Sequence, residues 1–231
     1  MNAVKHIFVD FEMNPIDKQF KEAREICKSE IIEIGAVILD DSLEVVSEFK
    51  KYVKPEYNKV SKKCSKLTGI TDEILESAPK FKEAVNEFMK WCKEHCEDEA
   101  FKVYEWSEND LKQLVKEIKL KQVSREGFEN FVVDWYDFQK EYSSLLGVEQ
   151  KISLSMAISS TGEEFEGQVH DALWDAKNTA SIFILSKNEK KFHAIMKPVL
   201  EALKPNKPMT YTLGDTLKKS LDKLSIMGAE A

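Results

Sequence analysis

Residues 31–39 read IIEIGAVIL, an apolar run that is rich in β-branched side chains. Such a run predicts a buried β-strand. Residues 40–42 predict a tight turn, and residues 43–53 predict a second strand that pairs with the first as a hairpin. Upstream of this hairpin, residues 4–10 read VKHIFVD and predict another buried strand. The amino-terminal part of the chain therefore predicts three strands of a sheet.

The rest of the chain alternates between helical and extended patterns. Residues 14–29 are long for a loop between adjacent strands, so we expect a flap or a short helix there. Residues 101–106 predict a fourth strand. Capping residues and the spacing of apolar side chains predict helices that begin at Ser77 and Ser107, and helices over residues 129–146, 153–158, 171–186 and 189–203. This order predicts an α/β protein with a mixed sheet on which helices pack.

The composition is that of a globular protein, because 42% of the 231 residues are apolar, which is enough to form a substantial core. No apolar run reaches the roughly 18 residues of a membrane-spanning helix, so no membrane association is expected. The amino terminus lacks the pattern of a secretory signal, which makes the cytoplasm the expected location.

The four cysteines are Cys27, Cys64, Cys92 and Cys96, and their spacing matches no disulfide framework and no common zinc motif. Cys92 and Cys96 share one face of a predicted helix, beside His95. Reduced, buried thiols are favoured there over a metal site.

The formal net charge of −7 is a poor fit for a protein that coats duplex DNA through bulk positive charge. It leaves open the binding of nucleic acid at a compact site where divalent cations attract phosphate. One basic stretch, residues 50–66, carries seven lysines that are opposed only by Glu56. A solvated edge is favoured for this stretch over a rim that guides phosphates.

Two acidic side chains, Asp10 and Glu12, follow the amino-terminal apolar strand. They are two residues apart, so both project from the same face of a strand. Carboxylates so placed repel each other unless a cation lies between them, and oxygen ligands of this kind suit Mg²⁺ or Mn²⁺ better than zinc. Taken alone, the pair is more typical of a solvated turn at a strand end than of a cation site.

Three further candidate site residues, Asp110, His170 and Asp175, lie at or near predicted helix starts. Ser107 and Asp110 have the spacing of a capping box, and capping alone accounts for Asp110. His170 and Asp175 are five residues apart, which turns a helix through roughly 500° and puts them on different faces. His170 is therefore expected in the loop before the helix, as a general base or a surface histidine, and Asp175 on the second turn. Jointly, the four acids and the histidine suit two-metal hydrolysis of a phosphodiester.

The ordered motifs also resemble a known family. They are DFE (residues 10–12), EIIEIGAV (residues 30–37), LTGIT (residues 67–71), Asp110 and HDALWDA (residues 170–176). This set resembles the DEDDh 3′-to-5′ exonucleases, which include RNase T and the DNA polymerase III epsilon-like enzymes. The long connection before Glu30 resembles the Eri-type and KapD-like branch. The resemblance covers about residues 4–187.

The resemblance implies a ribonuclease H-like fold, a mixed five-stranded sheet flanked by helices. It implies two Mg²⁺ or Mn²⁺ ions: one on Asp10, Glu12 and Asp175, the second sharing Asp10 and supported by Asp110 through water. His170 is implied as the base that deprotonates the attacking water. The terminal nucleotide is implied to lie against four residues, which are Phe11, Met13, Leu67 and Ile70.

The expected organisation is an exonuclease domain over residues 1–187 and a helical extension over residues 188–231, packed on or near the core. The expected partner is the single-stranded 3′ end of a nucleic acid, with release of nucleoside 5′-monophosphates. A catalytically idle binding module and a polymerase-associated partner remain as alternatives. The sequence does not distinguish RNA from DNA, and it leaves the oligomeric state open, a dimer included.

Overall fold

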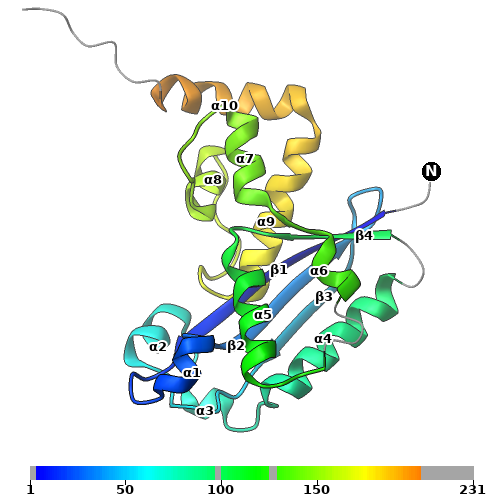
Figure 1. The fold of residues 1–231 in the computed structure, drawn as a ribbon. Helices are drawn as coiled ribbons and strands as arrows, with labels where there is room; N and C mark the ends of the chain where they lie inside the picture. The colour runs from blue at the N-terminus through cyan, green and yellow to red at the C-terminus, as the bar shows by residue number, and fades with distance from the viewer. Residues whose placement is uncertain (1–3, 97–99, 125–128, 204–231) are drawn as a thin grey trace, which may run out of the picture. The chain divides into compact units, whose positions relative to one another are not determined.

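A computed structural model of the protein describes residues 4–96, 100–124 and 129–203 (Figure 1). The chain divides into a large unit, Met1–Met196, and a second unit, Lys197–Ala231, which is described only as far as Leu203. The predicted extension begins with helix α10 (Glu189–Leu203). Its first half belongs to the large unit, where Tyr142 Oη lies 3.6 Å from Met196 Sδ. Residues 204–231 lie outside the described residues, so the boundary at residue 187 and the packing of the extension stay predictions.

The sheet has five strands in the order β3-β2-β1-β4-β5. The strands are β1 (Val4–Pro15), β2 (Ser29–Leu39), β3 (Val45–Tyr52), β4 (Ala100–Glu105) and β5 (Trp135–Asp137). Strand β2 is antiparallel to both β1 and β3, whereas β4 is parallel to both β1 and β5. The predicted mixed five-stranded sheet is confirmed, and so is the hairpin of β2 and β3.

Within the described residues, nine helices precede α10. They are α1 (Lys21–Ile26), α2 (Lys62–Thr68), α3 (Asp72–Leu75), α4 (Phe81–Cys96), α5 (Asn109–Leu120), α6 (Glu129–Val133), α7 (Phe138–Leu146), α8 (Leu154–Ser160) and α9 (Ala172–Lys187). Of the flap or short helix expected between β1 and β2, the structure shows a short helix, α1. Helices α2 and α3 had no sequence prediction. Within the described part of the chain, no helix is both long and apolar enough to cross a membrane.

Alternation along β1 assigns each face of the sheet to different helices. Ile7, Val9 and Phe11 belong to an apolar cluster with side chains of α4 and α5. Phe8 points the other way, and its ring centroid lies 5.1 Å from that of Phe183 in α9. Successive side chains of a strand point to opposite faces, so Asp10, like Phe8, lies on the α9 face. Figure 1 shows α4 apart from α9.

Three sequence predictions of boundaries were wrong. A single helix was expected over residues 129–146, but Trp135–Asp137 forms β5 between α6 and α7, because pairing with β4 outweighs local helical spacing. Ser77 was expected to cap a helix, yet α4 begins at Phe81 after Lys80 forms a bridge with Lys54.

The third error concerns β1, which was expected to end at Asp10. It continues to Pro15, because its pairing with β2 extends as far as Ser29. The two amino-terminal acids therefore lie within a paired strand and are held by its ladder.

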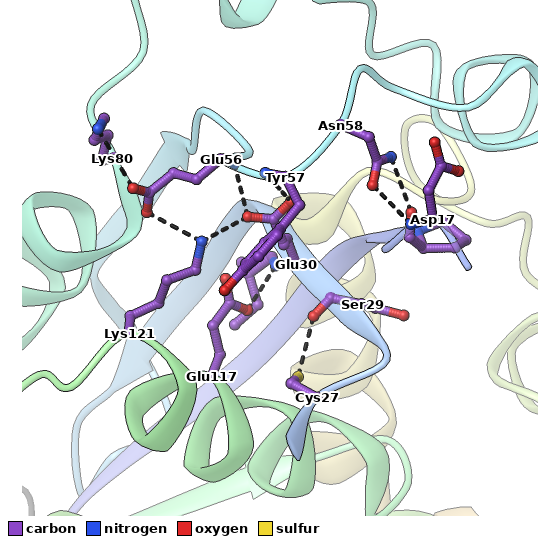
Figure 2. Close-up of polar contacts among 12 residues, drawn as sticks. Asp17, Cys27, Ser29, Glu30, Glu56, Tyr57, Asn58, Lys80, Glu117 and Lys121 are labelled. Atoms are coloured by element: carbon purple, nitrogen blue, oxygen red, sulfur yellow. Dashed lines mark hydrogen bonds and ion pairs between the residues drawn. The ribbon is translucent and has the colours of Figure 1, made fainter. Parts of the chain in front are cut away.

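A partly buried polar cluster holds the start of β2 in place (Figure 2). Lys121, just after α5, lies 2.7 Å from Glu30 and 3.1 Å from Glu56. The Glu30 carboxylate also accepts the backbone N–H groups of Glu56 and Tyr57. Glu117 accepts the backbone N–H of Ile31 at 2.8 Å. These contacts attach α5 and the segment before α2 to the strand that pairs with β1.

The four cysteines are buried free thiols, as the sequence predicts. His95 Nδ1 lies 2.9 Å from the carbonyl oxygen of Trp91. Among the described residues, the only group of side chains arranged to hold a metal lies elsewhere, on the α9 face of the sheet.

Candidate active site

The acids of β1 face the amino-terminal end of α9. In the register of the central strands, Asp10 lies opposite Gly35 and Glu12 lies opposite Glu33. Glu12 is buried, and a register irregularity follows it at Met13. Because Asp10 and Glu12 share a face, the strand geometry brings both carboxylates together under α9.

Asp110 reaches this pair from the start of α5. Strand β4 pairs with β1 only as far as Phe8, so the backbone of Phe11 has no strand partner on that side. The Phe11 N–H instead donates to Asp110 Oδ1 at 3.1 Å. The capping role expected from Ser107 and Asp110 was wrong, because the N–H of Leu111 donates to Glu105 at 2.8 Å. Glu105, at the end of β4, takes the place of a cap and leaves Asp110 turned toward β1.

Helix α9 packs directly on the backbone of β2. A Cβ placed on Gly35 would lie 2.0 Å from the carbonyl carbon of Ala172, so only glycine allows this approach. Asp171 is the N-cap and accepts the N–H of Trp174. Because α9 begins at Ala172, Asp175 lies in its first turn and not in the expected second turn.

His170 lies in the loop before α9, as the five-residue spacing predicts. Its φ of 64° is in the left-handed region, which non-glycine residues rarely adopt. Its Nδ1 lies 3.8 Å from Glu12 Oε1, and its side chain is 45% exposed. The backbone N–H of His170 donates to the Asp175 carboxylate. The histidine therefore stands beside the acids with its ring open to solvent, which is the placement that a base acting on water requires.

The gathered acids disfavour one another's charged forms. Burial raises the pKa of Asp10 well above its ordinary value, and repulsion from Asp110 and Asp175 raises it further. Burial, with repulsion from Asp175 and Glu33, raises the pKa of Glu12 to about 8. Burial also raises the pKa of Asp175 to about 7. Without a cation these acids therefore hold their protons more tightly than free carboxyl groups do, and a bound cation would displace those protons.

The donor set fits a divalent cation that prefers oxygen ligands. Glu12, His170 and Asp175 each offer a ligand atom, and these atoms lie within 4.8 Å of one another. Asp175 Oδ1 is buried and has no hydrogen-bond partner among the described residues. An unpaired buried carboxylate oxygen is costly unless a ligand completes it. Carboxylates in this number favour Mg²⁺ or Mn²⁺.

The four residues expected to hold the terminal nucleotide differ in accessibility. Leu67, at the end of α2, is 49% exposed. Met13 is half-buried, and Phe11 is buried in the cluster under α4 and α5. Ile70 is buried in a small cluster with Ile32, so its side chain supports the α2–α3 segment from within. Helix α2 is adjacent to β1, because Cys64 Sγ lies 3.5 Å from the carbonyl oxygen of Met13.

Sequence reasoning missed three charged residues behind the site. Glu33, on β2, accepts the N–H of Ala172 at 3.1 Å. Lys50, on β3, lies 3.0 Å from Glu33 Oε1 and also contacts Asp171. The available signal was the single acid within the IIEIGAVIL run, because a charge in a buried strand needs a partner.

Comparison with known proteins gives a consistent picture. The RNase_T family, described as exonuclease, matches residues 7–183. The 3′-5′ exoribonuclease 1 of Rattus norvegicus is 29% identical over 159 residues, which are 67% of this chain and 46% of that protein. The ERI1 exoribonuclease 2 of Danio rerio is 32% identical over 194 residues, 75% of this chain and 33% of that protein. The chain therefore spans less than half the length of these curated relatives.

Solved structures share the fold. The nuclease domain of 3′hExo, a DEDDh family member bound to rAMP, matches with a TM-score of 0.66 and 26% identity over 81% of this chain and 93% of that chain. Pop2p of S. pombe, in a form with Mg²⁺ and Mn²⁺ bound, matches with a TM-score of 0.56 and 17% identity over 80% of this chain and 84% of that chain. At that identity the second match shows the fold alone.

Proposed function

Because the chain belongs to the RNase_T exonuclease family, we propose that it is a 3′-to-5′ exoribonuclease that depends on two divalent cations. The convergence of Glu12, His170 and Asp175 from β1, the loop before α9 and α9 itself carries this proposal. The names of the relatives, which are exoribonucleases, favour RNA over DNA as substrate. The cytoplasmic location stays a prediction from the sequence.

The chain's own groups supply the remaining chemistry. Asp10, Glu12 and Asp175 would hold the first cation, with Asp10 shared and Asp110 supporting the second. Bound cations would stabilise the negative charge that develops on the phosphate and the leaving oxygen. His170 takes a proton from the water that attacks the terminal phosphorus. The bond from phosphorus to the penultimate 3′ oxygen breaks, and a nucleoside 5′-monophosphate leaves.

The substrate approaches from the side of α2. The last nucleotide lies near Leu67 and the backbone of Phe11 and Met13. Leu67 shares the outer face of α2 with Lys62, Lys63 and Lys66, which are exposed, whereas Cys64 and Thr68 are buried.

The lysines of α2 are free to meet phosphates. Three other lysines of the 50–66 stretch have protein partners: Lys50 and Lys51 pair with carboxylates, and Lys54 Nζ donates to the carbonyl oxygen of Glu76. Within the described part of the chain, Lys62, Lys63 and Lys66 have no carboxylate within ion-pair distance. We therefore assign these three to the RNA backbone next to the terminal nucleotide.

A degradation assay tests the proposed function. A 5′-labelled single-stranded RNA should shorten from its 3′ end in Mg²⁺, with release of nucleoside 5′-monophosphates, and Asp10→Ala should abolish this. Matched single-stranded DNA and a duplex with a 3′ overhang define the substrate class. RNA that binds without shortening would support the catalytically idle module instead, and faster loss of DNA would refute the assignment to RNA.

A further inference from the structure

A lysine lies between two acids on the α9 face of the sheet. Lys50 Nζ lies 3.0 Å from Glu33 Oε1 and contacts Asp171 Oδ2, which belongs to the residue after His170. Glu33 is buried and its second oxygen accepts the N–H of Ala172. Through one ammonium and one carboxylate, β2 and β3 therefore hold the first residues of α9.

The strand register explains why a lysine reaches this position. Lys50 of β3 lies opposite Gly35 of β2, and Gly35 lies opposite Asp10 of β1. The three residues therefore form one row across the sheet. Because Gly35 has no side chain, the lysine stem and the start of α9 both fit above it. Lys50 is thus on the same face of the sheet as the acids of the site, and strand β2 separates it from Asp10.

The two acids that contact Lys50 explain what the lysine does there. Glu33 and Asp171 raise the pKa of Glu12 through repulsion, after the larger effect of burial. Burial lowers the pKa of Lys50, but its hydrogen bonds to Asp171 and Glu33 outweigh that effect and raise it. Without the ammonium, Glu33 and Asp171 would repel each other at the point where α9 begins.

We propose that Lys50 is a positioning residue, which holds Asp171 against Glu33 and thereby fixes the left-handed turn of His170. The inference rests on the proposed function, since it assigns His170 to the attacking water. Asp171 connects Lys50 with His170, because it contacts the lysine, caps α9 through the N–H of Trp174 and follows His170 directly. In this proposal, the ion pairs of Lys50 with Glu33 and Asp171 hold the backbone that carries the imidazole.

Lys50→Met tests the proposal, because it keeps the length of the side chain and removes its charge. We expect kcat on single-stranded RNA to fall by about 10- to 100-fold, which is typical when a catalytic group is displaced by about 1 Å. KM for RNA should change by less than about threefold, because no substrate-contacting side chain is altered. The half-saturating Mg²⁺ concentration should not rise, since removal of a positive charge favours cation binding.

Two further variants make the test specific. Lys51→Met is the matched control, because Lys51 is adjacent on β3, points to the opposite face and pairs with Glu87 of α4 at 2.6 Å. Its kcat should match the wild type. Lys50→Arg should recover most of the activity, because a guanidinium can bind both carboxylates. Equal losses in the two methionine variants, or a higher Mg²⁺ requirement in Lys50→Met, would overturn the proposal.

Amide hydrogen exchange gives a measure that does not need activity. Ala172 and Trp174 donate their N–H groups to Glu33 and Asp171, so both should exchange faster in Lys50→Met and not in Lys51→Met. Unchanged exchange in Lys50→Met overturns the positioning role even if the enzyme is active. If the wild type does not degrade RNA, the proposed function fails, while the exchange data still decide whether Lys50 holds the turn.

Discussion

His170 Nδ1 lies 3.8 Å from Glu12 Oε1, although 158 positions of the chain separate the two residues. The contact brings a solvent-open imidazole to the edge of a buried carboxylate cluster. At this distance the ring is suited either to take a proton from water or to bind a cation directly. The two roles predict different responses to metal.

His170→Ala separates these roles. A base contributes about 10²- to 10⁴-fold to the rate, so kcat should fall by that amount while the half-saturating Mg²⁺ concentration stays within about threefold of the wild type. Asp175→Asn is the comparison, because loss of a ligand should raise the Mg²⁺ requirement by about tenfold or more. An equal rise in both variants would make His170 a ligand and remove it as the base.

The metal-free protein should lose stability as the pH rises. Glu12 has a pKa raised to about 8 and Asp175 to about 7, while Glu117, away from the site, is raised to about 8. A carboxyl group with a raised pKa binds its proton more tightly when folded, so the unfolding free energy falls as the pH rises from about pH 5 to about pH 8. The melting temperature in a chelator should follow this course.

The stabilisation of the protein by added Mg²⁺ should increase with pH, across the range in which the metal-free protein loses stability. Cation binding needs the deprotonated acids, so the rise in melting temperature on adding Mg²⁺ should grow between about pH 6 and about pH 8. Glu117→Gln is the control. In chelator, its melting temperature should fall less steeply with pH, and the rise in melting temperature on adding Mg²⁺ should be the same as in the wild type. An increment that does not depend on pH would contradict the assignment of Glu12 and Asp175 as ligands.

The strands of this fold were predictable because their apolar runs are long and local. Trp135–Asp137 is too short to show the alternation of side chains that predicts a strand, and only its pairing with β4 makes it one. The motifs shared with the family indicated which acids belong to the candidate active site, yet the pattern around Asp110 alone favoured a capping role for it. Its contact with Phe11 depends on where β4 stops, which no local pattern encodes. Likewise, only the sheet register brings Lys50 to Asp171.

Gly35→Ala should damage stability and activity together. The added methyl would lie 2.0 Å from the backbone of Ala172, so α9 or β2 must shift. Overpacking typically costs about 1–3 kcal/mol, and here the obstacle is backbone, which cannot rotate away. We expect a lower melting temperature and a higher Mg²⁺ requirement, because Asp175 moves with α9. Gly147→Ala has open space around the added carbon but strains a left-handed backbone (φ 67°), so it should lower the melting temperature and leave the Mg²⁺ requirement unchanged.

The lysines of α2 should matter only for long substrates. Replacing Lys62, Lys63 and Lys66 with glutamine removes three charges from the face that carries Leu67, so KM for a 20-nucleotide RNA should rise by about tenfold and depend less on salt. Cleavage of a dinucleotide should stay within about twofold, because it has no upstream phosphates to bind. The matched control replaces three lysines of α4, which are Lys82, Lys90 and Lys93. Comparable losses in both triple variants would show that bulk charge, and not the position of α2, attracts the RNA.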